Sequence, residues 1–189
     1  MPLEIERKFL IKTPLTIQNM RLVWLDAISV DHIYQFYLHS EKGVTRRLRS
    51  IRPYSSPPKM KSYKYIYTVK TNIAPGINEE DEKEVSLDEY EELAHRSNVD
   101  NSKAAIYKTR YTFEYENQVF ELDVFEKELE GLALLEIELD SMEDKVILPP
   151  FLNVAKEVTE DKRYRNSRIA KMVREYSYRI GEELWQKDF

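Results

Sequence analysis

The sequence predicts a mainly β fold with some helix, in the α+β class, and three observations predict it. Apolar and polar residues alternate with period two in about eight segments, which is the pattern of half-buried strands. Tyrosine is abundant, with 13 copies, and many of these fall in the alternating segments, as β structure favours. The chain has only 4 glycines, so we expect longer loops or helices instead of tight turns between some strands.

In the first half of the chain, the segment 3–11 alternates strictly and is predicted to be a strand, with Arg7 as the single charge on its apolar face. Apolar residues with helical spacing predict a short helix or two within 15–28. Alternation predicts further strands at 33–39, 44–51, 63–71 and 80–85. Glycine and proline predict turns or loops between them at 41–43, 53–61 and 72–79.

In the second half, Ser86 and Glu89 form a capping-box pattern, which predicts a helix from there to about Arg96. Two strands at 106–114 and 119–126 are predicted to form a hairpin that turns at Glu116-Asn117, and a bend near Gly131 precedes a strand at 135–140. A long amphipathic helix is predicted over about 165–186. Its apolar stripe is expected to pack against the rest of the protein.

Composition limits the function classes. The net charge of −5 does not favour a nucleic-acid partner, and zero cysteines exclude disulfides and thiolate metal sites. The N-terminus is acidic where a signal peptide needs an apolar run, and the sequence has no stretch apolar enough to span a membrane. We therefore expect one cytoplasmic domain over 1–189 without a membrane partner, and the sequence leaves open whether it forms a homodimer.

The polar faces of the predicted strands carry charges in spaced pairs. Residues two apart on a strand point the same way, about 6.6–6.8 Å apart. The acidic pairs are Glu4/Glu6, Glu82/Glu84 and Glu136/Glu138, and the basic pairs are Arg47/Arg49 and Lys108/Arg110. Paired carboxylates repel unless a cation lies between them, and oxygen ligands favour Mg²⁺ or Mn²⁺. Paired guanidinium groups suit phosphate oxygens.

Two structures are compatible with these faces. An ordinary sheet with a dry side and a wet side would expose the charges to solvent. A sheet that closes into a barrel with its charged faces inward would bring them together around a metal-bound polyphosphate. Its apolar outer face would then need a cover, which the helix after Ser86 and the C-terminal helix could provide. The three histidines, His32, His39 and His95, have no spacing that supports a catalytic triad or a histidine metal site.

The Glu-x-Glu-x-Lys motif formed by Glu4, Glu6 and Lys8 resembles the N-terminal signature of the CYTH superfamily, also called the triphosphate tunnel metalloenzymes. Later segments resemble later motifs of this family, in the family's order and over nearly the whole chain. They are Gln35-x-Tyr37, Arg47-Leu48-Arg49, 67–70, 108–111, 123–125, 136–138 and 157–166. The segment 157–166, followed by a long helix, is most similar to the bacterial inorganic tripolyphosphatase group.

The resemblance implies a closed tunnel of eight antiparallel strands with a charged interior and helices outside. It implies metal binding by Glu4, Glu6, Glu136 and Glu138. It implies triphosphate binding by Lys8, Arg47, Arg49, Lys70, Lys108 and Arg110. Lys8, Arg110 and Asp123 match positions that are implicated in catalysis.

Further candidates follow at other motif positions. They are Gln35 and Tyr37 on a strand, Glu82 and Glu84 as a third acidic pair, and Lys162 and Arg163 near the tunnel mouth. Relatives often carry an arginine two residues before the first acid of the third pair. Glu80 occupies that place here, so the register of this strand stays open.

The function that the resemblance implies is metal-dependent hydrolysis of the terminal phosphoryl group of inorganic triphosphate, a small-molecule substrate. A class IV adenylyl cyclase of the same superfamily and a thiamine-triphosphatase are the alternative enzymes. A non-catalytic module that binds polyphosphate or nucleotide is an alternative of another class, although the presence of all four N- and C-terminal glutamates counts against it.

Overall fold

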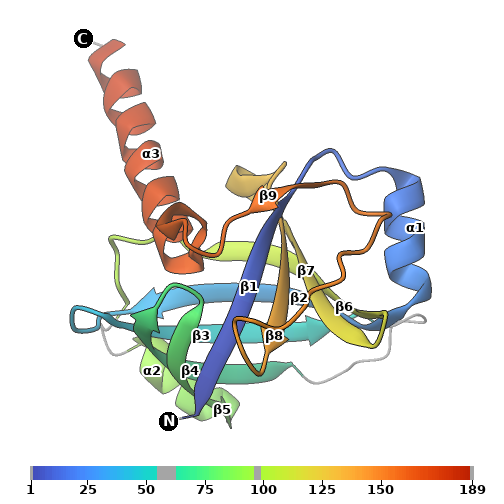
Figure 1. Cartoon of the computed structure of the whole chain (residues 1–189). Helices are drawn as coiled ribbons and strands as arrows, with labels where there is room; N and C mark the ends of the chain where they lie inside the picture. Colours follow the sequence, from blue (N-terminus) through green and yellow to red (C-terminus); the bar gives the residue numbers. More distant parts are fainter. Residues whose placement is uncertain (1, 55–62, 96–98, 188–189) are drawn as a thin grey trace.

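Eight antiparallel strands close into a barrel, and a ninth strand lies outside it (Figure 1). The structure is a computed structural model that describes residues 2–54, 63–95 and 99–187, with side chains of the last helix described to residue 177. The strands are β1 Leu3–Ile11, β2 Ala27–Leu38, β3 Val44–Pro53, β4 Lys64–Ala74, β5 Ile77–Val85, β6 Ile106–Tyr115, β7 Gln118–Phe125, β8 Ala133–Leu139 and β9 Val154–Glu157. Most of the loop predicted at 53–61 lies outside the described residues.

The strand order is β5-β4-β3-β2-β6-β7-β8-β1, and pairing of β5 with β1 closes the ring. This confirms the predicted closed eight-stranded barrel. The strand β9 was not predicted, and it pairs with the end of β1, from Phe9 to Ile11, where β5 no longer accompanies β1. The seam of the barrel is therefore shared, with β5 beside the start of β1 and β9 beside its end.

Three α-helices accompany the barrel: α1 Ile17–Leu25, α2 Leu87–His95 and α3 Asn166–Lys187. Two short 3-10 helices, η1 Lys127–Leu129 and η2 Lys162–Tyr164, lie in connections. The predicted capping box begins α2, because the Ser86 hydroxyl accepts from the Glu89 amide at 3.1 Å while the Glu89 carboxylate accepts from the Ser86 amide at 3.0 Å. None of the helices in the described part of the chain is both long and apolar enough to cross a membrane.

Two turns fix the strand registers. Glu116 and Asn117 both have positive φ, 50° and 57°, and form the predicted hairpin between β6 and β7. Gly76 turns β4 into β5 with φ of 71°, and a Cβ atom there would lie 2.6 Å from the carbonyl oxygen of Glu6. Only glycine fits this close approach, and the Gly76 carbonyl in turn accepts from the Glu6 amide at 2.8 Å.

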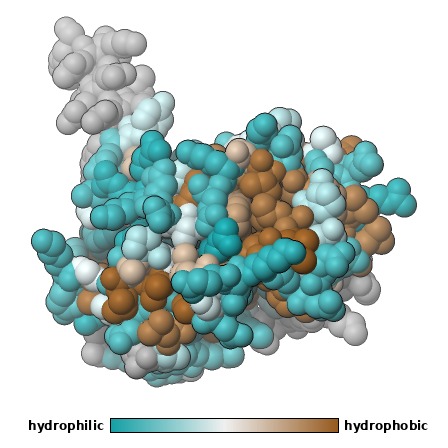
Figure 2. Space-filling view, viewed as in Figure 1, coloured by the Kyte–Doolittle hydropathy of each residue, from teal (hydrophilic) through white to brown (hydrophobic). Residues whose placement is uncertain are grey.

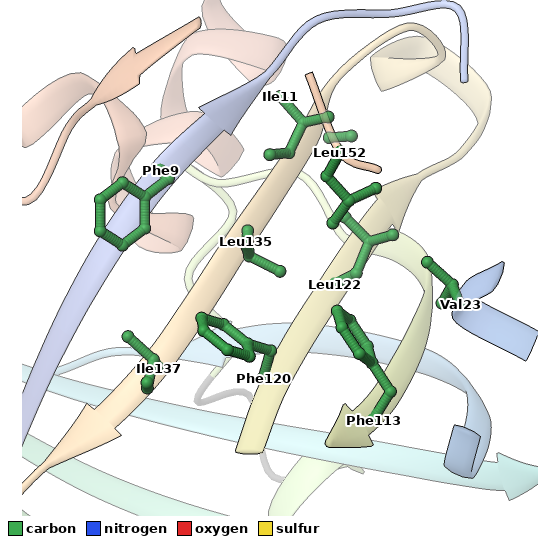
Figure 3. Close-up of a cluster of buried hydrophobic side chains, with 10 residues drawn as sticks. Phe9, Ile11, Val23, Phe113, Phe120, Leu122, Leu135, Ile137 and Leu152 are labelled. Carbon is green, nitrogen blue, oxygen red and sulfur yellow. The ribbon is translucent and has the colours of Figure 1, made fainter. Parts of the chain in front are cut away.

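The largest apolar cluster lies on the outer face of β1, β6, β7 and β8, and not inside the barrel (Figure 3). Phe9, Phe113 and Phe120 are among its buried side chains. It is covered by α1 through Val23 and by the segment before β9 through Leu152. The outward-packing residues of these four strands alternate with Lys8, Arg110, Asp123 and Glu136, so those charged side chains point to the interior.

The helix α2 covers part of the barrel as predicted, because Tyr90 and Leu93 pack against Phe36 and Leu48 on the outer face of β2 and β3. The prediction for α3 is right only at its first turns. Ile169 and Ala170 pack with Tyr37 and Val158 at one end of the barrel.

Farther along α3, the expected packing is wrong at Met172 and Tyr176, which are 44% and 66% exposed, while the side chains of two later stripe residues, Ile180 and Leu184, lie outside those described. The physical reason is visible in Figure 1, where α3 runs away from the barrel beyond its first turns. The face shown in Figure 2 is mostly hydrophilic, as the charged composition predicts.

Candidate functional site

The strand registers bring the predicted charged pairs together inside the barrel. On β1, Glu6 lies opposite Glu138 of β8, and Lys8 lies opposite Glu136. On the other side of the ring, Lys70 of β4 lies opposite Glu80 of β5. Side chains in register on neighbouring strands share one face. Residues that are far apart in sequence thus meet in one interior.

A cavity of about 130 Å³ occupies this interior at the end where α3 begins. One water molecule needs roughly 10–15 Å³, so the cavity can hold a larger polar guest. The basic residues that line it are Lys8, Arg47, Lys70, Arg110 and Arg165. The segment from Val158 to Ser167 lines one side, so the connection after β9 and the start of α3 close the barrel there.

A buried group of charges lies against this cavity, and two of its members, Arg110 and Glu136, also line it. The Lys108 and Asp123 side chains are 1% and 0% exposed and form an ion pair. Arg110 also donates two hydrogen bonds to Asp123, both at 2.7 Å, and one to Glu136 at 2.9 Å. Burial opposes ionisation of Asp123, but Arg110 and Lys108 keep its pKa below the usual value. These charges are satisfied by one another.

Glu136 belongs to the same buried group. Its carboxylate lies 2.8 Å from the Lys8 ammonium and accepts from Arg110. Burial would raise the pKa of Glu136, but Lys8 and Arg110 hold it well below the usual value. The pKa of Lys108 falls to about 8, because Lys108 is buried and lies near Arg110. The structure places Lys108 outside the cavity lining, so its predicted contact with triphosphate remains a prediction.

The positive charges of Arg47 and Arg49 on β3 are balanced less completely by carboxylates. Arg49 pairs with Glu82, and Arg47 lies 3.3 Å from Glu80 and 3.7 Å from Glu82. Burial and the neighbouring charge of Arg47 lower the pKa of Arg49 to about 10. Two buried guanidinium groups side by side favour an anion between or above them. Glu82 lies opposite Thr68 and pairs with Arg49 although its side chain is 39% exposed, which answers the question of the β5 register, and Glu84 is exposed as well.

The ammonium group of Lys70 contacts three carboxylates near the start of β1. Lys70 pairs with Glu4, and its Nζ lies 3.7 Å from Glu6 and 3.1 Å from Glu80. Burial and the charges of Glu6 and Glu80 raise the pKa of Glu4 to about 7, against the opposing charge of Lys70. This crowding of carboxylates is relieved if a further cation joins them.

Glu138 lies beside Glu6 on the neighbouring strand, but it has no ionic or hydrogen-bonding partner among the described residues. It is also exposed. The donor set of Glu4, Glu6 and Glu138 therefore fits a hard divalent cation by its chemistry. As the side chains stand, no three acids or histidines in the described ranges converge on one metal position.

Tyr37 contributes a hydroxyl to the cavity. It is 2% exposed, and its oxygen accepts a hydrogen bond from the Gln35 side chain at 2.8 Å. Among the residues that the structure describes, none accepts a hydrogen bond from this hydroxyl. The Tyr37 proton is therefore free to be donated to an oxygen in the cavity.

Lys162 and Arg163 do not line the cavity. Both are exposed in η2, and Arg163 pairs with Asp161 at 2.6 Å. Arg165, two residues on, lines the cavity instead and donates to Asn72 at 3.1 Å. Arg165 therefore occupies the position at the cavity that was predicted for Lys162 and Arg163.

Sequence reasoning missed two further interior acids. Glu121 pairs with Arg110 from β7, and Glu80 lies between Arg47 and Lys70. Both were detectable from spacing, because Glu121 is two residues before Asp123 and Glu80 is two residues before Glu82.

Fold and site together define a barrel protein with an enclosed, charged interior that suits a polyanion and cations. No family model matches the chain. The solved structure of the inorganic triphosphatase NE1496 is 30% identical in sequence and covers 90% of this chain and 96% of its own, with a TM-score of 0.52. The chain belongs to the CYTH superfamily, the triphosphate tunnel metalloenzymes.

Two curated relatives match a shorter part of the chain. A protein of Acetivibrio thermocellus named inorganic triphosphatase is 44% identical over 69 residues, which are 36% of this chain and 43% of that protein. A protein of Nitrosomonas europaea with the same name is 44% identical over 68 residues, which are 34% of this chain and 44% of that protein. The matched region thus spans less than half the length of these curated relatives.

Proposed function

We propose that this protein is a divalent-metal-dependent hydrolase that removes the terminal phosphoryl group of inorganic triphosphate. The observation that carries the proposal is the cavity, in which Lys8, Arg47, Lys70 and Arg110 surround one space that the carboxylates of Glu6 and Glu136 also line. The names of the relatives support the same substrate. That the protein acts in the cytoplasm, and that it could form a homodimer, remain predictions from the sequence.

The basic residues bind and orient the phosphate chain in this proposal. Arg47 has a fork of N–H donors that matches phosphate oxygens, and Lys8 and Lys70 add point charges. Tyr37 donates its hydroxyl proton to a phosphate oxygen. These groups are already in place in the protein, so they stabilise charge that develops on the phosphates without costly reorganisation.

Arg110 and Asp123 have a shared role. Asp123 holds the guanidinium of Arg110 through two hydrogen bonds, so one edge of Arg110 is fixed while another part lines the cavity. Lys108 completes the support from behind through its ion pair with Asp123. We infer that Asp123 and Lys108 position Arg110, and that Arg110 contacts the substrate.

Glu4, Glu6 and Glu138 would hold Mg²⁺ or Mn²⁺. When bound, such an ion neutralises phosphate charge and lowers the pKa of a water molecule. The reaction joins a water oxygen to the terminal phosphorus and breaks that phosphorus's bond to the bridging oxygen, so the products are phosphate and pyrophosphate. Glu136 was also predicted to bind metal, but its ion pairs with Lys8 and Arg110 favour a supporting role.

The alternative substrates have less support. Both curated relatives carry the name inorganic triphosphatase, and neither name refers to a nucleotide or to thiamine. The cavity of about 130 Å³ also has charged or polar residues around most of its lining, with Tyr37 and Tyr164 as its two aromatic residues among those described. A short polar chamber suits a phosphate chain better than a base or a thiazole ring.

The test is a product assay. The protein is incubated with triphosphate, ATP and thiamine triphosphate in separate reactions, each with Mg²⁺, with Mn²⁺ or with EDTA. We expect phosphate and pyrophosphate from triphosphate, and loss of turnover in EDTA. Cyclic AMP from ATP would support the cyclase instead, and binding without turnover of any substrate would support the non-catalytic module.

A further inference from the structure

Glu80 occupies an unusual position among the interior acids. Its two carboxylate oxygens lie 3.3 Å from Arg47 and 3.1 Å from Lys70, so it joins two cations that both line the cavity. Its side chain is 14% exposed, and it is not among the residues that line the cavity. It therefore contacts, from behind, donors that a bound polyanion would contact from the front.

The interior charges form one connected network of ion pairs no longer than 4.0 Å. Among the described residues, its cations are Lys8, Arg47, Arg49, Lys70, Lys108 and Arg110. Its carboxylates are Glu4, Glu6, Glu80, Glu82, Glu121, Asp123 and Glu136. Six positive charges thus face seven negative ones, and the network carries a net charge of −1 when all groups are ionised. Without the charge of Glu80 the network would be neutral.

We propose that Glu80 is a resident counter-ion that makes the cavity reject uncomplexed polyphosphate and accept its complex with a divalent cation. This inference rests on the proposed function. A bare polyphosphate brings several negative charges to a network that has no excess of positive charge, and it must compete with Glu80 for Arg47 and Lys70. A polyphosphate that carries a divalent cation brings fewer charges, and the cation can share the excess of carboxylates near Lys70.

A purely structural role for Glu80 has the opposite consequence. If Glu80 only holds Arg47 and Lys70 in place, its loss disorders these two side chains and weakens the binding of every anion. If Glu80 is a counter-ion, its neutralisation leaves Arg47 and Lys70 with more uncompensated positive charge. The binding of the bare anion is then strengthened most. Glu80→Gln separates the two, because glutamine keeps the size and a carbonyl oxygen that accepts hydrogen bonds but removes the charge.

The experiment is isothermal titration of the whole protein with sodium triphosphate in EDTA, and with Mg²⁺ and triphosphate together. We expect Glu80→Gln to bind triphosphate in EDTA roughly tenfold more tightly than the unaltered protein, as one unit charge removed at close range allows. The affinity for the magnesium complex should change less. Glu80→Asp keeps the charge and should keep the preference for the complex.

Asp81→Asn is the matched control. Asp81 is the next residue on β5, is exposed, and lies opposite Val69 of β4. Its substitution removes the same unit charge without touching the network, so its affinities should equal those of the unaltered protein. Urea unfolding of each variant checks that the fold is intact.

Two outcomes would overturn the inference. If Glu80→Gln binds bare triphosphate no more tightly than Asp81→Asn does, or binds it more weakly, Glu80 is a positioning residue and not a counter-ion. The unaltered protein distinguishes this from failure of the proposed function. If it binds and hydrolyses magnesium triphosphate, the proposed function stands and only the role of Glu80 is wrong.

Discussion

Two charged regions inside the barrel differ in how completely their charges are satisfied. The Lys108 and Asp123 side chains are at most 1% exposed and form an ion pair, and Arg110 donates two hydrogen bonds of 2.7 Å to Asp123. Around Lys70 one ammonium faces three carboxylates, and two of its contacts are 3.1 Å and 3.7 Å long. The first region resembles a packed core made of charges, whereas the second needs a ligand to balance it. The difference teaches that balanced charges can support a site from within the protein, whereas an excess of one sign leaves a region that a ligand can balance.

The largest expected effect of a substitution on stability lies in the satisfied region. Lys108→Met leaves the fully buried Asp123 with Arg110 as its remaining cationic partner, and the loss of one partner of a buried pair costs about 3–5 kcal/mol. We expect the free energy of unfolding in urea to fall by this amount. Lys64→Met, at an exposed position on β4, is the control. A loss below about 1 kcal/mol would contradict the structural assignment of this region.

The next effect lies in the unsatisfied region and concerns activity. Arg47→Met removes a cavity-lining guanidinium, and we expect kcat/KM for triphosphate to fall by about 10²–10³-fold, or roughly 2.7–4 kcal/mol of transition-state stabilisation. Arg46→Met is the matched control, because Arg46 is a neighbour that pairs with the exposed Glu41. Equal activity of the two variants would show that Arg47 does not contact substrate.

Glu138→Gln tests the unpaired acid. Because Glu138 has no partner among the described residues, we expect its free energy of unfolding to stay within about 0.5 kcal/mol of the original. Metal-dependent turnover should fall by at least about 10–100-fold, and it should recover partly at higher Mg²⁺ concentration. A Mg²⁺ titration of initial rates measures this, with Asp140→Asn as the control. An unchanged Mg²⁺ dependence would remove Glu138 from the proposed metal site.

The smallest effect is expected at Tyr37. Tyr37→Phe removes one hydrogen bond to the phosphate chain, which contributes about 1 kcal/mol, so we expect KM to rise roughly fivefold with a smaller change in kcat. Tyr34→Phe, on the outer face of the same strand, serves as the control. If both variants keep the original KM, the Tyr37 hydroxyl serves packing alone.

Much of the fold was predictable because period-two alternation is a local property. The whole of β1 follows from alternation at residues 3–11, and α2 follows from Ser86 and Glu89. The strand β9 is only four residues long and pairs with β1, which is far away in sequence. No local pattern therefore predicts it. The apolar periodicity over 165–186 predicts the helix α3 correctly. Periodicity does not show how many turns of the helix have the barrel beside them.

The site was predictable as a set of residues and not as a set of partners. Strand parity placed Glu6, Lys8 and Arg49 inside, as observed. Pairing depends on register between strands that are far apart in sequence. Spacing could therefore not tell that Glu136 is neutralised by Lys8 and Arg110, while Glu138 makes no such contact with the residues that the structure describes. Arg165 reaches the cavity only because η2 folds the chain across the barrel end.

The seam beside β1 determines where this ring of strands is easiest to part. The register of β1 with β5 extends only from Leu3 opposite Glu79 to Ile5 opposite Ile77, whereas that of β2 with β3 extends from Asp31 to Leu38. Beyond Ile5, the amide of Glu6 is held by the carbonyl of Gly76, which itself borders the chamber. Separating β1 from β5 would therefore break little backbone pairing, and the strands that carry Lys108 and Asp123, β6 and β7, take no part in that pairing.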